Sequence, residues 1–560
     1  MKKRVIYQIF TRLYCNPAKE QVPGGSIEQN GCGKMNSFTP EILAGIRENG
    51  YTDIWFTGLI AHASVTDYSK YGIPVSHAAT VKGIAGSPYA IRDYYDIDPD
   101  LAVSVPDRLD EFKSLVKRVH DTGLGFIMDF VPNHVAREYK SVCMPKGEIG
   151  LGEADDCTKA FSPDNNFYYI LGQQLSGEID WKDYTENPAK ATGNDKFCAT
   201  PSVCDWYETV KLNYGVDYQY NGLGKQFNPI PSTWLRMRSI LLYWASMGVD
   251  AFRCDMAEMV PVEFWHWAIA EVKKKYKKIQ FIAEVYNPGS YTSYIEWGGF
   301  DYLYDKVGLY DTLRAVVEGR ESATAITGCW QRTGGNGPHM LHFMENHDEQ
   351  RIASDFFAGN AWKARPAMIV SALMDTCPVM VYAGQELGER GMDHEGFSGH
   401  DGRTTIFDYW APDTLSRLYN NGKFNTELLT AREKELYAFY SALLNITRKE
   451  KAVSGGKFFD LMYVNPWSDH FNPHRQYAFL RADSRSCMLV AVNFSDMDLM
   501  TETIIPAHAF EYMNLPEKEN CTMTELLSGR KFKADLKKDH PVRYTVPANS
   551  GIVIKFSTGH

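Results

Sequence analysis

The sequence has no long hydrophobic run and no excess of positive charge. No apolar stretch approaches the roughly 20 residues of a membrane-spanning helix, so no membrane partner is expected. The 59 Lys and Arg residues are outnumbered by 69 Asp and Glu, for a formal net charge of −10. Because nucleic-acid binding needs concentrated Lys and Arg, this balance argues against a nucleic-acid partner. A short basic run at 273–278 follows a helical stretch and indicates a solvated helix end.

The cysteine spacing and the N-terminal segment give no sign of export. The eleven cysteines contain no Cys-x-x-Cys pair. The apolar segment Val5–Phe10 is shorter than the roughly 7 to 15 residues of a secretory signal core. Free thiols and a cytoplasmic location are therefore expected. A disulfide between Cys143 and Cys157, or between Cys198 and Cys204, is the alternative for an exported protein.

The order of expected elements predicts an α/β fold. At 560 residues the chain is too long for one compact core. From residue 5 to about 450, short β-rich runs alternate with helical patterns, as in a parallel sheet. Eight strands are expected, at Val5–Phe10, Asp53–Phe56, Gly125–Phe130, Gly248–Arg253, Gln280–Ala283, Asp301–Leu303, Leu341–Glu345 and Pro378–Tyr382. Helices are expected at Pro106–Thr122, Ser232–Met247, Pro261–Lys275, Trp362–Asp375 and Ala431–Lys449. This count predicts a (β/α)₈ TIM barrel.

Two intervals depart from the alternation. The interval 135–228 is rich in Gly, Asn, Asp, Tyr and Trp, and a structureless loop of that length is uncommon in a compact domain. We expect an inserted domain there. After 450, short alternating runs predict an all-β sandwich, with strands at Tyr477–Ala482, Cys487–Asn493, Val542–Val546 and Gly551–Phe556. The expected division is a barrel at 1–134 and 229–450, an inserted domain at 135–228 and a C-terminal β domain at 451–560.

Polar residues follow four of the expected strands. Barrel enzymes place their sites at the C-terminal ends of the strands, and buried charges are costly unless they are paired or functional. Convergence of several such residues on one barrel face therefore indicates a site. The segments are 129–134 after the third strand, 249–255 on the fourth, 281–286 on the fifth and 343–348 on the seventh.

Each of these residues also has a structural explanation. Asp255 with Arg253 forms a salt bridge in that view, Glu284 is an ordinary rim acid, and His134 and His347 are buried structural histidines. The spacing from 255 to 284 matches one strand–helix–strand step, so the two acids lie on neighbouring strands. Two carboxyls about 5 Å apart retain configuration in glycoside hydrolysis, whereas about 6.5–9.5 Å gives inversion. Motifs for phosphate loops, dinucleotides, zinc proteases and serine hydrolases are missing.

The four segments resemble the signature regions of the α-amylase family of glycoside hydrolases. The likeness extends over roughly residues 4–450, and 451–560 also looks like the family's C-terminal domain. Two further segments are similar to family motifs after strands two and eight, namely Ser87–Tyr95 and Val381–Glu386. The interval 135–228 stands where the family carries its domain B.

The resemblance implies a role for each matching residue. Asp255 would be the nucleophile, Glu284 the general acid and base, and Asp348 the stabiliser of the transition state, with retention of the α configuration. Arg253 would fix the ionisation of Asp255 by a charge-assisted hydrogen bond. The expected substrate-binding residues are Tyr89, His134, Arg253, His347 and Arg351.

The resemblance suggests no cofactor for the chemistry and one structural metal. Asn133 matches a calcium ligand of many family members. Its partners would come from 135–228, where Glu153, Asp155 and Asp156 are either ligands or solvated turn residues. Calcium takes about six to eight oxygen ligands, so a lone Asn is insufficient. Aromatic residues of the same interval are expected to form its core and, in part, to line the sugar site; they are Trp181, Trp206, Tyr207, Tyr214, Tyr218 and Tyr220.

The expected function is retaining hydrolysis of malto-oligosaccharides, starch or glycogen-derived glucans, with an oligosaccharide or polysaccharide as the partner. Glu258 and Met259 stand where the family often has Lys-His. That departure keeps a transglycosidase or isomerase on the same scaffold as an alternative, with a sugar or phosphate acceptor in place of water. A non-catalytic glucan-binding protein is a third hypothesis, and it predicts erosion of the three acids, all of which are present.

Overall fold

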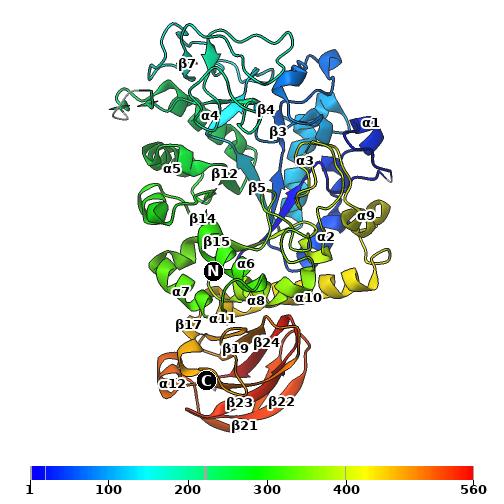
Figure 1. Cartoon of the computed structure of the whole chain (residues 1–560), viewed down its shortest axis with the longest axis vertical. Coiled ribbons are helices and arrows are strands. Elements are labelled where there is room, and N and C mark those ends of the chain that lie inside the picture. Colours follow the sequence, from blue (N-terminus) through cyan, green and yellow to red (C-terminus); the bar gives the residue numbers. More distant parts are fainter. Residues whose placement is uncertain (1–2, 19, 220–223, 398, 559–560) are drawn as a thin grey trace.

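The computed structural model describes residues 3–18, 20–219, 224–397 and 399–558 (Figure 1). Eight strands close into a barrel in the order β1-β16-β15-β14-β13-β12-β5-β2, and their pairings are parallel. These strands are β1 (Val5–Phe10), β2 (Asp53–Thr57), β5 (Gly125–Phe130), β12 (Ala251–Cys254), β13 (Gln280–Ala283), β14 (Tyr302–Tyr304), β15 (Met340–Phe343) and β16 (Val379–Tyr382). The predicted (β/α)₈ barrel is confirmed.

The expected strands lie where the sequence places them, because barrel strands are buried on both faces and form continuous apolar runs. The largest difference is at β12, which begins at Ala251 and not at Gly248. The helix expected from Trp362 is preceded by a 3₁₀ turn, Ala361–Ala364, and begins at Arg365. Pro366 explains the position of that start, since proline lacks an N–H and fits the first helical turn.

Helices cover the outside of the barrel (Figure 1). The longest, α10 (Ala431–Lys449), begins with a capping box in which Thr430 and Glu433 satisfy each other's backbone N–H groups. The other principal helices are α2 (Pro40–Glu48), α3 (Arg108–Asp121), α4 (Ser232–Ser246), α5 (Val262–Lys275), α6 (Asp311–Val317), α7 (Ala325–Thr333) and α8 (Arg365–Leu373). Short helices are α1 (Ile27–Asn30), α9 (Asp413–Tyr419), α11 (Lys451–Gly455) and α12 (Ala507–Met513).

The chain between β5 and β12 forms small antiparallel pairs at one end of the barrel. In the described part of this segment, β6 pairs with β9, β7 with β8 and β10 with β11. Their bounds are β6 (His134–Ala136), β7 (Tyr169–Ile170), β8 (Ala189–Lys190), β9 (Thr209–Lys211), β10 (Val216–Asp217) and β11 (Gly224–Lys225). An additional pair, β3 (Ile60–His62) and β4 (Ile91–Ile97), follows β2. The boundaries at 135 and 228 stay predictions.

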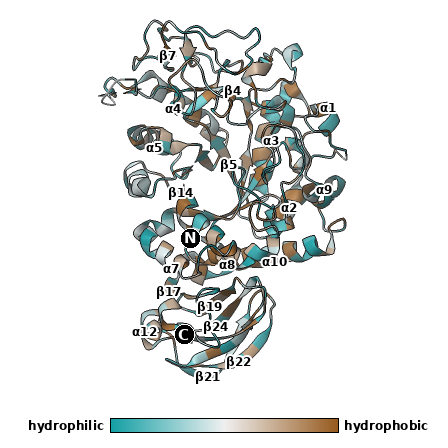
Figure 2. Ribbon diagram, in the orientation of Figure 1, coloured by the Kyte–Doolittle hydropathy of each residue, from teal (hydrophilic) through white to brown (hydrophobic). Residues whose placement is uncertain are grey.

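The C-terminal part is a β structure that packs on helix α8. One sheet has the order β17-β18-β19-β24-β21-β22, and β20 pairs with β23. Figure 2 shows hydrophobic residues along β19 and β24, whose side chains are mostly buried. The strands are β17 (Lys457–Asp460), β18 (Gln476–Ala482), β19 (Ser486–Asn493), β20 (Leu499–Ile504), β21 (Lys518–Glu525), β22 (Lys531–Leu536), β23 (Pro541–Val546) and β24 (Ser550–Ser557). The all-β prediction is confirmed, and the boundary at 451 stays a prediction.

No helix among the described residues is long and apolar enough to span a membrane.

Candidate active site

A single buried arginine joins the carboxylates at the ends of three neighbouring strands. Arg253 on β12 is fully buried, and its Nη1 lies 2.9 Å from Asp255 Oδ1 and 3.3 Å from Asp129 Oδ1. Its Nη2 lies 2.8 Å from Glu284 Oε2, at the end of β13. The Nε donates to the hydroxyl of Tyr304 at 3.1 Å. One planar guanidinium therefore sets the relative positions of the two acids expected to do the chemistry.

The backbone after Asp255 adds a second donor to Glu284. Met256 has a left-handed conformation, with φ of 41° and ψ of 41°. This conformation is uncommon for a residue with a side chain, and such strain is concentrated at functional sites. The Met256 N–H donates to Glu284 Oε2 at 2.8 Å, and the hydroxyl of Tyr286 donates to Glu284 Oε1. Both oxygens of Glu284 are thus occupied by donors.

The cluster holds more acids than its one arginine can neutralise. Burial raises the pKa of Asp129 to about 7, although Arg253 and the indole of Trp55 oppose the rise. Burial also raises the pKa of Asp255; Arg253 opposes this change, whereas Glu284, Asp129 and Asp348 add to it. Like charges this close favour a shared proton. The cluster can therefore hold and exchange a proton near neutral pH.

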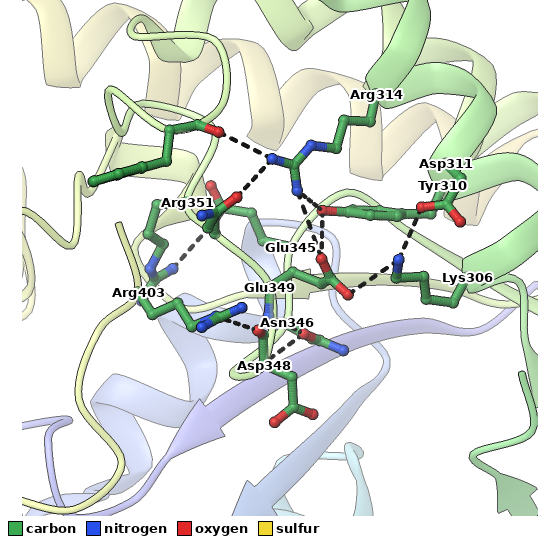
Figure 3. A network of polar contacts seen from close by, with 12 residues as sticks. Lys306, Tyr310, Asp311, Arg314, Glu345, Asn346, Asp348, Glu349, Arg351 and Arg403 are labelled. Atoms are coloured by element: carbon green, nitrogen blue, oxygen red, sulfur yellow. Dashed lines mark hydrogen bonds and ion pairs between the residues drawn. The ribbon is translucent and has the colours of Figure 1, made fainter. Parts of the chain in front are cut away.

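The loop after β15 presents Asp348 and is held by a polar network (Figure 3). The side-chain oxygen of Asn346 accepts from the N–H groups of Asp348 and Glu349, both at 2.9 Å. Arg403 Nε donates to the carbonyl oxygen of Asp348 at 2.6 Å. Behind the loop, Glu349 accepts from the hydroxyl of Tyr310 at 3.1 Å. The Asp348 side chain faces the pocket with 42% of it exposed, and its Oδ2 lies 3.2 Å from His347 Nε2.

Two residues expected to bind sugar lie together beside Asp348. The ring of Tyr89 stacks on that of His347 with centroids 5.1 Å apart. The Tyr89 hydroxyl lies 2.6 Å from His347 Nε2, and Gln8 Nε2 lies 2.8 Å from His347 Nδ1. Burial lowers the pKa of His347 to about 3, helped by Arg253. The imidazole is therefore neutral and serves as a hydrogen-bonding group.

A cavity of about 400 Å³ opens above the carboxylates. Its lining includes five residues expected from the sequence, Tyr89, His134, Asp255, Glu284 and Asp348. Trp206, Glu208 and Thr209 form another part of the wall, so the segment between β5 and β12 contributes to the site. A pocket of this size, with a few convergent polar groups and perturbed pKa values, has the form of a small-molecule site.

A family model described as the catalytic domain of α-amylase matches residues 8–287, which is half of the chain. The matched span contains Asp255 and Glu284. The chain belongs to the α-amylase family.

Individual α-amylases match at low identity. α-Amylase 2 of Dictyoglomus thermophilum is 21% identical over 547 residues, which cover 96% of this chain and 74% of that protein. α-Amylase MalA of Haloarcula japonica is 26% identical over 391 residues, which cover 69% of this chain. The match spans only 44% of the length of MalA. The solved structure of a maltogenic α-amylase, AmyB from Thermotoga neapolitana, has a TM-score of 0.63 at 19% identity, over 99% of this chain and 98% of AmyB, and so shares its fold.

Two arginines expected at this α-amylase-family site to bind sugar make other contacts. Among the described residues, neither Arg253 nor Arg351 lines the pocket. Arg351 is buried, with its Nη1 2.8 Å from Glu345 and its Nε donating to Thr404 at 2.9 Å. These two contacts hold Arg351 against the loop after β15, and its expected sugar contact stays a prediction. Arg253 likewise acts through the carboxylates that it binds.

The residues around Asn133 do not fit a calcium ion. Its Oδ1, the atom a metal would use, accepts from the ammonium of Lys211. That lysine is buried and lies 2.7 Å from Asp195 Oδ1 and 3.3 Å from the carbonyl oxygen of Met259. A calcium ion here would meet a positive charge in place of one of its oxygen ligands. The acids offered as partners are used locally, since Asp155 accepts from the N–H of Asn166 at 2.7 Å and Asp156 lies in a turn.

Sequence reasoning missed several residues of the pocket wall. Tyr286 stands two positions after Glu284, so the segment was identified but the contact between their side chains was not. Lys82 and Glu208 line the pocket as an ion pair, with the two atoms 3.0 Å apart. No sequence motif predicts this ion pair, because its two residues come from distant segments. Trp206, which was expected from the sequence, also lines the pocket, with its ring 5.2 Å from that of His134.

Among the other expected aromatic residues, Trp181, Tyr207 and Tyr214 are buried in the core. Tyr218 is partly exposed, and its ring packs 5.9 Å from that of Tyr168. Tyr220 lies outside the described residues. Of the six aromatic residues named from the sequence, Trp206 is the one found among the residues that line the cavity.

Proposed function

We propose that this member of the α-amylase family is a retaining hydrolase of α-glucans, such as malto-oligosaccharides. The observation that carries the proposal is the bridge that Arg253 makes between Asp255 and Glu284 at the floor of a pocket that Asp348 also faces. Two carboxyls from neighbouring strand ends, one to attack and one to transfer a proton, are what retaining hydrolysis requires. The relatives named above support the substrate class.

In this proposal the reaction has two displacements. Asp255 attacks the anomeric carbon while Glu284 gives its proton to the leaving glycosidic oxygen, so one C–O bond forms as the other breaks. Glu284, now ionised, takes a proton from water, and the oxygen of that water displaces Asp255. Asp348 lies close enough to the same cavity to stabilise positive charge on the sugar ring. Neither step needs a cofactor.

The test is to replace Asp255 with Asn and Glu284 with Gln and to assay both variants on maltotetraose and soluble starch. We expect each kcat to fall by at least about 1000-fold with unchanged thermal stability, because each variant removes a group that acts in the chemical step. Turnover at the wild-type rate in either variant would contradict the proposal. Binding of glucans without turnover by the wild-type protein would instead favour a non-catalytic binding protein.

The acceptor is tested separately by product analysis. Attack of water on the glycosyl-enzyme yields shorter glucans, whereas attack by a sugar hydroxyl yields longer oligomers or isomers. Incubation with maltose, maltotriose, sucrose and trehalose, followed by chromatography, distinguishes the two outcomes. We expect glucose and maltose as the main products.

We propose further that the protein needs no calcium at Asn133 and works in a reducing compartment such as the cytoplasm. The ammonium of Lys211 beside Asn133 supports the first point. The second is supported by the eleven cysteines, all of which are free thiols.

A further inference from the structure

The hydroxyl of Tyr286 contacts the carboxylate oxygen of Glu284 that can exchange a proton with a ligand. Oε2 accepts from two N–H groups, of Arg253 and Met256, each at 2.8 Å. Neither N–H group can accept a hydrogen bond, so a proton on Oε2 would face two donors. Among the described residues, Oε1 has a single partner, the hydroxyl of Tyr286, which can both donate and accept. The exchangeable proton therefore belongs on Oε1.

Glu258 holds Tyr286 in that place. One oxygen of Glu258 accepts from the N–H of Tyr286 at 2.8 Å and from the N–H of Asn287 at 3.2 Å. Glu258 follows β12 and Tyr286 follows β13, so this carboxylate ties together the two loops that carry Asp255 and Glu284. Glu258 thus uses its carboxylate on the protein's own backbone, at a position where the family often has Lys.

We propose that Tyr286 is a positioning residue that holds Oε1 of Glu284 through both displacements, and that Glu258 fixes Tyr286 for this purpose. This inference rests on the proposed function. When Glu284 is ionised, Tyr286 donates to Oε1. When Glu284 is protonated, the Oε1 proton can point to the hydroxyl oxygen of Tyr286 or to the leaving glycosidic oxygen. Tyr286 thereby maintains the orientation of the Glu284 carboxyl group while water replaces the leaving group.

The hydroxyl of Tyr286 donates to Oε1 of Glu284, and hydrogen bonds to a carboxylate are stronger than those to its neutral form. Tyr286→Phe removes this donor. The other titratable or charged groups that face Glu284 come from β5, β12, β14 and the loop after β15, and a change at Tyr286 leaves them in place. They are Asp129, Arg253, Asp255, Tyr304, His347 and Asp348.

The experiment compares Tyr286→Phe with the wild type in the pH dependence of kcat/KM on maltotetraose. The alkaline limb reports ionisation of the general acid in the free enzyme. We expect Tyr286→Phe to shift that limb to higher pH by about half to one unit. Glu258→Gln should shift it in the same direction by a smaller amount. Tyr294→Phe is the matched control, because its hydroxyl donates to the carbonyl oxygens of Glu258 and Val260 in the same region without touching Glu284.

A superimposable alkaline limb for Tyr286→Phe and the wild type, with the wild type active, would overturn the inference but not the proposed function. A wild type that cleaves no α-glucan would overturn the proposed function instead. In that case the inference can still be tested without substrate, by measuring the difference in melting temperature between Tyr286→Phe and the wild type. We expect this deficit to be larger at pH 8 than at pH 4, because the lost hydrogen bond is strongest to ionised Glu284. A deficit independent of pH, as expected for Tyr294→Phe, would refute it.

Discussion

Arg253 and Arg351 are both buried at the same end of the barrel, with 0% and 1% of their surface exposed. Arg253 lies within 3.3 Å of carboxylate oxygens from three residues, Asp129, Asp255 and Glu284. Within the described part of the chain, Arg351 forms an ion pair with one carboxylate, that of Glu345, at 2.8 Å. Both arginines follow or end a barrel strand beside acids, so they look alike in the sequence. Their surroundings show that they do different work.

The difference lies in what each arginine contacts directly. Arg351 forms one ion pair, which holds the loop after β15, although the buried carboxylates of Glu386, Glu389 and Glu395 also lie near it. One arginine among three carboxylates leaves negative charge that must be relieved by binding protons. The second arrangement lies under the pocket, and the first does not. In this molecule, direct contact of one arginine with several carboxylates under the pocket distinguishes the chemical site from the structural ion pair of Arg351.

The strongest test of the difference between the two arginines is to make the same substitution at both. Lysine keeps the charge but cannot bridge two carboxylates as a guanidinium does. We expect Arg253→Lys to lower kcat on maltotetraose by about 100-fold, since small errors in placing reacting groups are costly. Arg351→Lys should retain kcat/KM within about threefold at a temperature where it is folded, and should lower the melting temperature. Equal losses of kcat in the two variants would refute the distinction.

A second prediction uses the proton that the acid-rich cluster holds. The pKa of Asp129 is raised to about 7 in the folded protein, from an ordinary value of 3.8. Between these values the folded form keeps a proton that the unfolded chain has lost, so the free energy of unfolding falls as pH rises. The Asp129→Asn variant has no ionisable side chain at this position, so it lacks this pH dependence. Its melting temperature relative to the wild type should therefore rise between pH 4 and pH 7, and a constant difference would contradict the assignment.

Metal removal should have the smallest effect. Because Lys211 donates to the oxygen of Asn133, we expect EDTA to leave both turnover and melting temperature unchanged. A matched substitution, Lys211→Met, should lower stability by several kcal/mol, since it leaves polar groups without their buried partner. If EDTA abolished activity and added calcium restored it, a metal would bind elsewhere or displace Lys211.

Much of the barrel was predictable because its strands are short apolar runs separated by helical patterns, and β1, β5 and β13 have the predicted bounds. The placement of Asp255 and Glu284 on neighbouring strands follows from the same order. Side-chain direction was not predictable. The sequence pattern does not indicate that Arg351 turns to Glu345, or that Lys211 reaches Asn133 from a strand of the inserted segment.

The start of helix α8 and the contacts across the pocket show a second limit. Pro366 determines where α8 begins, but the amphipathic pattern before it extends to Trp362. Glu258 was noted as a departure from the family pattern, yet its contact with the N–H of Tyr286 depends on two loops meeting in space. Local patterns predict elements; contacts between loops require the structure.

The central claim is that Asp255 and Glu284, joined by Arg253, carry out a double displacement. Proton NMR of the products formed within the first turnovers of maltotetraose tests it most directly, because the anomeric signal distinguishes the two configurations before mutarotation. The account predicts that the new reducing end appears first as the α-anomer. Initial formation of the β-anomer would mean inversion by a single displacement, and it would contradict the roles assigned to both carboxylates.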